Sequence, residues 1–274
     1  MTESDVIKKT KNGPVTVLSL MDDLSALGVT PGMTLMVQSS LSEVGWASGG
    51  PVAIIQALEN ILGTEGTLVM PTHSGDLSDP EDWSNPPVPQ EWKEKIRQSM
   101  PAFDPDLTPT RGMGKIPETF RKQAGVLRSC HPHTSFAAWG EKAPFITENH
   151  ALDFALGDNS PLARIYDLNG WILLLGVGHD SNTSLHLAEF RADYTGKKNM
   201  KQGAPILVDD ERHWIELNEI EDNTDDFPEI GKAYQQSGGT QKEGKIGMAQ
   251  SLLIPQRELV DFSIQWMQAN RSIK

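Results

Sequence analysis

The sequence predicts an α/β fold in which flanking helices cover a central mixed or parallel sheet. An amphipathic helix over residues 16–27 precedes an apolar strand over 34–38. A helix over 51–62 and a second strand over 66–70 follow. Residues 171–177 form an unbroken apolar run, as expected of a parallel strand that is covered on both faces. This alternation of strands and helices predicts a parallel core with crossover helices.

The boundaries of the first two helices follow from local signals. Leu20, Leu24 and Leu27 recur at the spacing of a single helix face, and Gly28 follows as a stop signal. The next helix begins at Pro51, since proline is tolerated in the first turn of a helix.

Residues 73–112 differ from this regular pattern. Prolines recur from Pro80 to Pro109 and predict that long helices and strands are absent. Aromatic residues between them, such as Trp83, argue against disorder. Because long loops within compact domains are usually functional, we expect a packed insertion that forms a wall or lid of the site.

The rest of the chain continues the α/β pattern, and we expect one domain over residues 1–274. The further expected elements are helices over 115–123 and 160–168, a strand over 136–139, a helix that ends near 192, a hairpin of 204–208 and 213–218, and a terminal amphipathic helix over 255–270. An exposed face on that last helix could form a dimer contact, so we expect either a monomer or a homodimer.

Composition and charge narrow the classes of function. The formal net charge of −13 disfavours nucleic-acid binding and favours a cationic small molecule. No apolar run approaches the roughly 20 residues that cross a bilayer, and the start lacks a signal-peptide pattern. A single cysteine, Cys130, excludes an internal disulfide. We therefore expect a cytoplasmic protein with no membrane partner.

The strongest local signal follows the strand over 171–177. Open α/β sheets bind ligands at the carboxyl ends of strands, and Asn182 or Thr183 is placed to cap the helix that starts there. His186 and Glu189 are three residues apart and therefore share one helix face. A carboxylate beside a histidine fixes its tautomer and suits general-base chemistry, although structural pairs have the same spacing.

Two other segments carry polar side chains suited to a site. Ser39 and Ser40 follow the strand over 34–38, where hydroxyl groups can bind amide or phosphate oxygens. His131 and His133 flank a proline beside Cys130 and could seed a metal site. That spacing is uncommon among metal ligands, so we expect no metal there and favour a loop that lines a ligand tunnel.

Several familiar motifs are absent from the sequence. There is no Gly-x-Gly-x-x-Gly after a strand, no Walker A loop and no Gly-x-Ser-x-Gly elbow. The Gln/Arg-x-x-Gly-x-Gly/Ala segment of the common N-acetyltransferase superfamily is also missing. Any use of acetyl-CoA would therefore require a different fold.

Taken together, short segments over roughly 16–270 resemble the aminoglycoside 3-N-acetyltransferase family. The segments that carry the resemblance are Ser39-Ser40-Leu41, Gly45, Gly49-Gly50, Gly63, Gly66 to Thr72, Phe103-Asp104-Pro105, Thr108-Pro109-Thr110, Met113-Gly114, Phe120-Arg121, Arg128-Ser129, His131-Pro132, Ser135, Gly157, Ser160-Pro161-Leu162, Leu174, Gly176, Asp180, Thr183, His186 and Glu189. Their order and number make chance similarity very improbable.

The resemblance implies direct acetyl transfer from acetyl-CoA to an amine, without a covalent acyl-enzyme. It places the catalytic base at His186, its orienting partner at Glu189 and a third member at Asp180. It also implies that the cofactor is approached by Ser39, Ser40, Leu41, Thr72 and Ser135. Backbone N–H groups at those turns would stabilise the thioester oxyanion.

One departure from the family concerns the acceptor. The dedicated resistance enzymes have a Leu-His-His-Ala-Glu segment and lack a histidine before the aspartate, whereas this chain has Leu187 and His179 there. It is similar instead to the chromosomal Gram-positive branch. An aminoglycoside amine, the 3-amine of 2-deoxystreptamine, or a related cationic molecule would then meet Glu219, Glu221 and Asp222, although such a run is also typical of a solvated hairpin edge.

Two alternatives remain open on the sequence alone. One is a metal-dependent hydrolase that uses the histidines His131, His133, His179 and His186. The other is a relative that binds coenzyme A and acts on a non-aminoglycoside amine or lacks catalysis.

Overall fold

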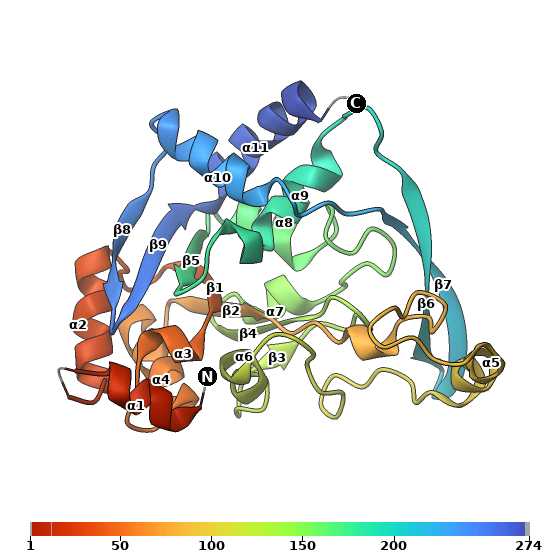
Figure 1. Ribbon diagram of the computed structural model, residues 1–274, viewed down its shortest axis with the longest axis horizontal. Helices are drawn as coiled ribbons and strands as arrows, with labels where there is room; N and C mark the ends of the chain where they lie inside the picture. The colour runs from red at the N-terminus through yellow and green to blue at the C-terminus, as the bar shows by residue number, and fades with distance from the viewer. Residues whose placement is uncertain (1, 12, 272–274) are drawn as a thin grey trace.

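A computed structural model describes residues 2–11 and 13–271 and shows a seven-stranded sheet between helical layers (Figure 1). The strands are β1 (Thr34–Ser39), β2 (Thr67–Pro71), β3 (Leu127–Arg128), β4 (Phe136–Gly140), β5 (Trp171–Leu175), β8 (Lys242–Ile246) and β9 (Ala249–Pro255), and a separate pair comprises β6 (Asn199–Val208) and β7 (Glu211–Ile220). The helices are α1 (Glu3–Lys9), α2 (Val17–Leu27), α3 (Leu41–Val44), α4 (Pro51–Leu62), α5 (Gln90–Ser99), α6 (Lys115–Phe120), α7 (Ala143–Thr147), α8 (Pro161–Asp167), α9 (Ser184–Arg191), α10 (Phe227–Gln236) and α11 (Gln256–Asn270), with short 3-10 turns at η1 (Gly75–Leu77) and η2 (His179–Ser181).

The large sheet is mixed, with the strand order β3-β4-β2-β1-β5-β9-β8. Its centre confirms the expected parallel core, because β1 pairs in parallel with both β2 and β5. The strands added on either side, β4 and β9, are antiparallel to their neighbours. The carboxyl ends of β1, β2 and β5 therefore meet at one edge of the sheet.

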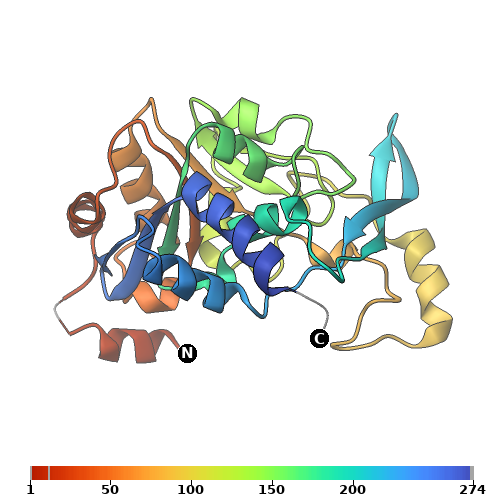
Figure 2. The same cartoon turned by 90° about the horizontal axis from the view of Figure 1, so that it is seen from above.

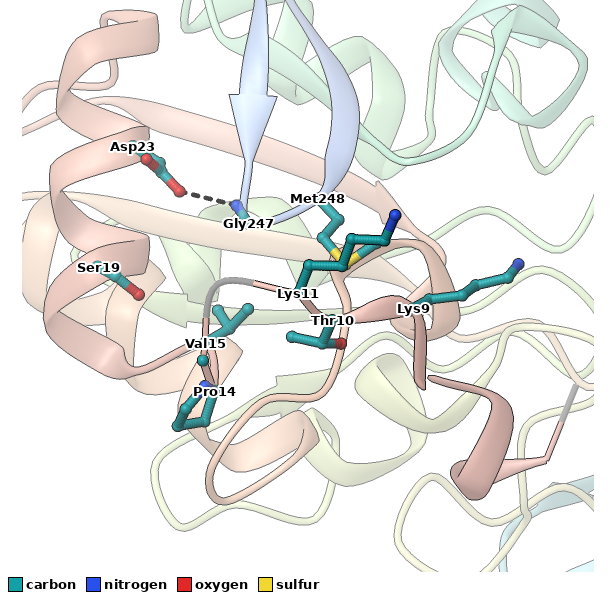
Figure 3. Close-up of a pocket in the computed structure, with 10 residues that line it drawn as sticks. Lys9, Thr10, Lys11, Pro14, Val15, Ser19, Asp23, Gly247 and Met248 are labelled. Atoms are coloured by element: carbon teal, nitrogen blue, oxygen red, sulfur yellow. Dashed lines mark hydrogen bonds between the residues drawn. The ribbon is translucent and has the colours of Figure 1, made fainter. Parts of the chain in front are cut away.

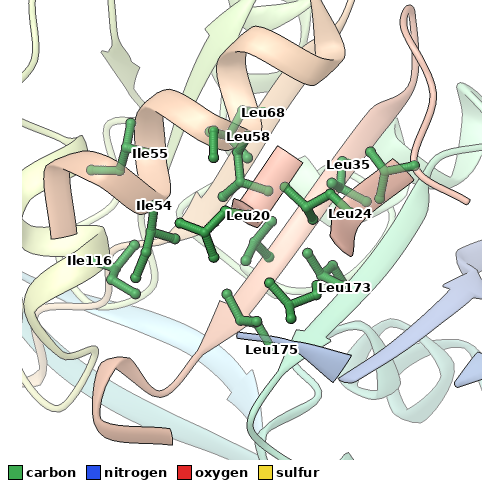
Figure 4. Close-up of a cluster of buried hydrophobic side chains, with 14 of the residues drawn as sticks. Leu20, Leu24, Leu35, Ile54, Ile55, Leu58, Leu68, Ile116, Leu173 and Leu175 are labelled. Carbon is green, nitrogen blue, oxygen red and sulfur yellow. The ribbon is translucent and has the colours of Figure 1, made fainter. Parts of the chain in front are cut away.

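Alternating side chains of β1 enter two different cores. Leu35 and Val37 pack in a cluster with Leu20, Leu24 and Leu58 of α2 and α4 (Figure 4). Met36 belongs to the opposite cluster, which α7, α8, α9 and α11 cover. Because successive side chains of a strand point to opposite faces of the sheet, β1 packs against a layer of helices on each face.

The Pro-rich insertion contains a helix that the sequence analysis missed. The ten-residue α5 begins after Pro89 and ends before Pro101, so it occupies the longest proline-free stretch of the insertion. It lies beside the β6–β7 hairpin at one end of the molecule (Figure 2), where Phe103 N–H donates to Pro205 O over 3.0 Å. The prolines of 73–112 were expected to prevent long regular elements, and the helix fits between two of them.

The last third of the chain also departs from expectation. The hairpin strands are longer than predicted, and α10, β8 and β9 were not predicted at all. The apolar face of α11 is covered within the chain, where Leu259, Val260 and Met267 are buried against α9 and its neighbours. That face is therefore occupied and not exposed for a partner. No helix within residues 2–11 and 13–271 is both long and apolar enough to cross a membrane.

Gly140, at the end of β4, lies so close to the backbone before β2 that it has no room for a side chain. Its φ is +106°, and a Cβ there would lie 2.1 Å from Gly66 O, whereas Gly125 has φ +83° and no atom within 4 Å of such a Cβ. We expect Gly125→Ala to cost about 1 kcal/mol of unfolding free energy and Gly140→Ala about 3 kcal/mol or more. Urea unfolding of both variants measures this, and equal losses would contradict the steric argument.

Candidate active site

The ends of β1 and β5 bring together two segments that are far apart in the sequence. Ser40 N–H donates to Leu175 O over 2.9 Å, and Gln38 lies opposite Leu174. The serine segment after β1 therefore lies beside the turn that leads from β5 into α9. Sequence reasoning expected both segments at the carboxyl edge of the sheet, and the structure places them there.

The start of α9 is anchored on both sides. Asn182 Oδ1 accepts from Ser184 N–H over 3.2 Å, while Thr183 makes no capping bond through its side chain within the described chain. The Ser184 hydroxyl donates to Met36 Sδ at 3.8 Å and accepts from Gln256 Nε2 at 3.1 Å. These contacts tie the helix to β1 below it and to α11 beside it.

His186 and Glu189 form the pair that helix spacing predicted. Nδ1 of His186 lies 3.1 Å from Glu189 Oε2, and the carboxylate is fully buried. Because a carboxylate only accepts, Nδ1 carries a proton, and in the neutral ring the lone pair is then on Nε2. Phe227 packs edge-on against the imidazole, with ring centroids 5.0 Å apart. The ring is thus held in one tautomer and one orientation.

Two further donors satisfy the other oxygen of Glu189. Asn223 N–H donates to Oε1 over 2.8 Å, and Arg271 Nη1 donates over 2.5 Å. Burial alone would raise the pKa of Glu189, but the bonds from His186, Asn223 and Arg271 outweigh it and lower the pKa. Glu189 is therefore a carboxylate at neutral pH. Nothing in the sequence pattern pointed to Asn223 or Arg271.

His73 is a neighbour of this pair that the sequence analysis did not single out. Burial lowers its pKa to about 3, and the nearby His186 imidazole adds to the effect. Its ring packs edge-on against Phe136, with centroids 5.4 Å apart. His73 is thus neutral at physiological pH. Its position directly after the strand-terminal Pro71-Thr72 was a signal that could have identified it.

Buried polar atoms without partners gather at the same strand ends. Within residues 2–11 and 13–271, the Gln38 amide, Ser39 Oγ and His73 Nε2 are buried and have no hydrogen-bond partner. Leaving such groups unpaired costs free energy, so an unmet buried polar atom calls for an explanation such as a ligand. These atoms indicate a polar ligand between the ends of β1 and β2.

A cavity of about 660 Å³ opens on the α3–α4 side of these strand ends. Its lining includes Ser39, Ser40 and Leu41, three of the residues that the resemblance assigned to the cofactor. The other lining residues come from α1, α3, the glycine-rich loop before α4, the first residue of α4, and the segment from the end of the insertion into α6: Glu3, Val6, Ser42, Gly45, Trp46, Ala47, Gly49, Gly50, Pro51, Gly112, Met113, Gly114, Lys115 and Ile116. From the insertion over 73–112, Gly112 lines this cavity, and the expectation that the insertion forms a wall or lid of the site stays a prediction.

Thr72 and Ser135, the other two predicted cofactor residues, lie deeper. Both are fully buried, and their hydroxyl oxygens are 3.2 Å apart. Arg128 donates to Ser135 Oγ and to Thr72 O, over 3.0 and 2.8 Å. Burial lowers the pKa of this guanidinium to about 10, so it stays charged. These bonds join the end of β2 to the residue before β4, and a contact of Thr72 and Ser135 with the cofactor stays a prediction.

Asp180 and His179 lie apart from the pair. Asp180 is exposed, and within the described chain no hydrogen bond joins it to His186. His179 is buried against Gly231 of α10, where a Cβ would meet the imidazole at 2.1 Å, and its Nδ1 lies 3.2 Å from Asn182 Nδ2. The structure therefore does not place Asp180 as a third member behind Glu189.

The predicted acceptor residues fall into two environments. Glu219 is buried on β7 and accepts from Ala155 N–H over 2.9 Å; burial raises its pKa to about 7, although that bond opposes the shift. Glu221 and Asp222 are exposed and line a separate cavity of about 410 Å³ that also touches Arg271. The acidic segment is solvated, as a hairpin edge would be, but it also lies beside Asn223 and Arg271, which bind Glu189.

His131 and His133, two of the histidines considered as metal ligands, form hydrogen bonds to other groups of the protein. His131 Nδ1 accepts from Thr134 N–H over 3.0 Å, and its Nε2 lies 3.2 Å from Leu152 O. Burial lowers the pKa of His131 to about 2. His133 Nδ1 lies 2.9 Å from Gln202 Oε1. Among residues 2–11 and 13–271, no group of three or more His, Cys, Asp or Glu side chains is arranged to hold a metal ion.

A smaller cavity of about 350 Å³ lies between the end of α1, the start of α2 and the β8–β9 turn (Figure 3). Lys9 and Lys11 lie at its rim, and Asp23 accepts from Gly247 N–H over 2.7 Å. Its one carboxylate is used to hold the turn, so the cavity offers no catalytic pair comparable to His186 and Glu189.

Comparison with known proteins finds relatives along most of the chain. The family model described as aminoglycoside 3-N-acetyltransferase matches residues 36–268. The SPbeta prophage-derived aminoglycoside N(3')-acetyltransferase-like protein YokD of Bacillus subtilis is 47% identical over 260 residues, which are 94% of each chain. Aminoglycoside N(3)-acetyltransferase VII of Streptomyces paromomycinus is 38% identical and covers 98% of this chain and 96% of its own.

Solved structures show the same architecture. YokD superposes with a TM-score of 0.95 at 46% identity, covering 97% of this chain and 98% of its own. AAC-IIIb with CoASH gives 0.84 at 33% identity, covering 96% and 99%, and AAC-VIa bound to sisomicin gives 0.85 at 32%, covering 94% and 99%. These neighbours confirm the mixed α/β fold. The chain therefore belongs to the aminoglycoside 3-N-acetyltransferase family of acetyltransferases.

Proposed function

We propose that this protein transfers the acetyl group of acetyl-CoA directly to an amine of an aminoglycoside or a related polycation, with His186 as the general base. The observation that carries the proposal is the buried Glu189 carboxylate, which holds Nδ1 of His186 and leaves Nε2 free to accept a proton. Solved relatives support the two substrates, since one is a complex with CoASH and another is bound to sisomicin.

The reaction balances with these groups alone. His186 Nε2 takes a proton from the acceptor amine as its nitrogen attacks the thioester carbonyl carbon. The C–N bond forms, the C–S bond breaks, and the proton passes to the leaving thiolate. Glu189 stabilises the imidazolium that forms transiently beside it, because an opposite charge nearby favours the charged form.

The cofactor would span the two layers of helices. The cavity at Ser39, Ser40 and Leu41 lies on the α3–α4 side, whereas His186 lies on the α9 side of the same strand ends. A long, thin arm that crosses the ends of β1 would join them, and the unpartnered Ser39 Oγ and Gln38 amide lie along that path. The glycines of the loop before α4 leave room for the bulky end of the cofactor.

The acceptor would approach from the β7 side. Glu219, Glu221 and Asp222 lie on the segment that runs from β7 to α10, the element that carries Phe227 against His186. Carboxylates attract a polycation and steer its approach. The departure at Leu187 and His179 leaves open which cation is the physiological acceptor, so a panel of 2-deoxystreptamine antibiotics and other amines is the appropriate test.

Replacing His186 tests the base. We expect His186→Ala to reduce acetyl transfer by about 10²- to 10⁴-fold, because the proton of the attacking amine loses its acceptor. Release of the coenzyme A thiol across the amine panel measures the rate, with His213→Ala on the exposed hairpin as the matched control. A His186→Ala enzyme as active as the control would refute the proposed mechanism.

Filling the cavity tests the cofactor site. Ser42 of α3 lines it, whereas Ser48 is exposed in the loop after α3 and does not line it. Ser42→Trp should raise KM for acetyl-CoA at least about tenfold, equivalent to ~1.4 kcal/mol of binding free energy. Steady-state kinetics with Ser48→Trp as control measure this, and an unchanged KM in Ser42→Trp would place the cofactor elsewhere.

Proton release from Glu219 when the acceptor binds tests the acceptor site. Its pKa of about 7 keeps it partly protonated near neutrality. A bound polycation favours the carboxylate, so binding slightly below that pH should expel up to about one proton from Glu219. Calorimetry in buffers of different ionisation enthalpy counts protons released. We expect Glu219→Gln to release fewer than wild type; identical counts would show that the acceptor does not sense Glu219.

A further inference from the structure

One guanidinium, that of Arg271, joins the segments that surround His186. Its Nη1 donates to Glu189 Oε1 over 2.5 Å, on the carboxylate oxygen that His186 does not use. Its Nε and Nη2 each donate to one carboxylate oxygen of Asp226 over 2.7 Å. Nη2 also donates to Asn223 O over 2.7 Å. Arg271 follows α11 directly, at the end of the described chain (Figure 1).

The partners of Arg271 belong to the two segments that contact the His186 ring. Glu189 accepts from its Nδ1, and Asn223 N–H fixes the same carboxylate from the other side. Asp226 immediately precedes Phe227, whose ring packs edge-on against the imidazole. The guanidinium therefore couples the hydrogen bond and the aromatic contact that orient this histidine.

We propose that Arg271 is a positioning residue for acetyl transfer: it holds Glu189 and the 223–227 segment in place and thereby aims Nε2 of His186 at the acceptor amine. This inference rests on the proposed function of His186. Arg271 itself touches neither reacting atoms nor cofactor in this arrangement. It acts through Glu189 and Phe227.

The chemistry of the contact suits arginine and not lysine. The planar fork donates to both oxygens of Asp226 while a third N–H reaches Glu189, whereas an ammonium group cannot bridge two carboxylates in this geometry. The Arg271 side chain is 8% exposed and lies over the Tyr194 ring, 5.0 Å from its centroid. A buried carboxylate that lost this partner would retain an uncompensated charge and would shift its side chain or backbone.

The test compares Arg271→Ala, Arg271→Lys and a matched control. We expect kcat to fall about 10- to 100-fold in Arg271→Ala, because a small misplacement of a catalytic group costs this much. KM for acetyl-CoA should stay near the wild-type value, since the cofactor cavity is lined by other elements. Arg271→Lys should recover part of kcat, and added guanidinium should recover part of it in Arg271→Ala.

Arg257, in the first turn of α11, provides the control. It donates to Tyr166 O and Asp167 O, away from the site. Arg257→Ala should therefore keep kcat close to wild type and should not respond to guanidinium. If Arg271→Ala fails to fold, Arg271→Lys carries the test, with lowered kcat and unchanged KM for acetyl-CoA as the expected result.

A double-mutant cycle separates positioning from general damage. In a Glu189→Gln background, the loss from Arg271→Ala should largely disappear, because residues that act through one another are not additive. Additive losses without guanidinium rescue, or wild-type kcat in both Arg271 variants, would overturn the inference. A fully active His186→Ala enzyme would instead refute the proposed function, so the two failures are distinguishable.

Discussion

The site depends on the burial of one carboxylate. Glu189 is fully buried, and a charge in that position is tolerated only when it is paired and hydrogen-bonded. Three donors from three parts of the chain meet this requirement: the His186 imidazole, Asn223 N–H and the Arg271 guanidinium. Because the donors come from α9, the segment before α10 and the residue after α11, the carboxylate fixes how these elements sit around the histidine. In the proposed reaction, the same charge would stabilise the proton that His186 takes up.

The sheet supplies the second constraint. Parallel pairing of β1 with β2 and β5 brings three chain turns to one edge, and Ser40 is bonded there to the end of β5. The two faces of the sheet are covered by different helices, so the large cavity and the His186–Glu189 pair reach that edge from opposite layers. A ligand that uses both must cross the strand ends, where Gln38 and Ser39 present buried polar atoms without partners in the described chain. This arrangement suits a cosubstrate with a long arm between its recognition element and its reactive thioester.

Features set by residues close together in the sequence could be predicted, whereas features set by contacts between distant residues could not. The His186–Glu189 pair and the helices over 16–27 and 51–62 were predictable because their spacing is local, and the serines after β1 followed from the general rule for strand ends. Arg271 could not be assigned, because its partner Glu189 lies 82 residues earlier. The strand β9 joins the sheet through long-range pairing with β5, and β8 pairs with β9 in turn, so neither place in the sheet follows from a local signal. The 3-10 turn leaves Asp180 exposed and apart from the His186–Glu189 pair, a backbone detail that residue spacing does not encode.

The central claim is that Glu189 fixes the tautomer of His186 so that Nε2 is the free base. Imidazole ¹⁵N chemical shifts of His186, measured in the wild-type protein at mildly alkaline pH and compared with Glu189→Gln, test it most directly. The account predicts that wild type carries its proton on Nδ1, and that this preference weakens in the variant. A wild-type ring with the proton on Nε2 would leave no base facing the acceptor and would contradict the account.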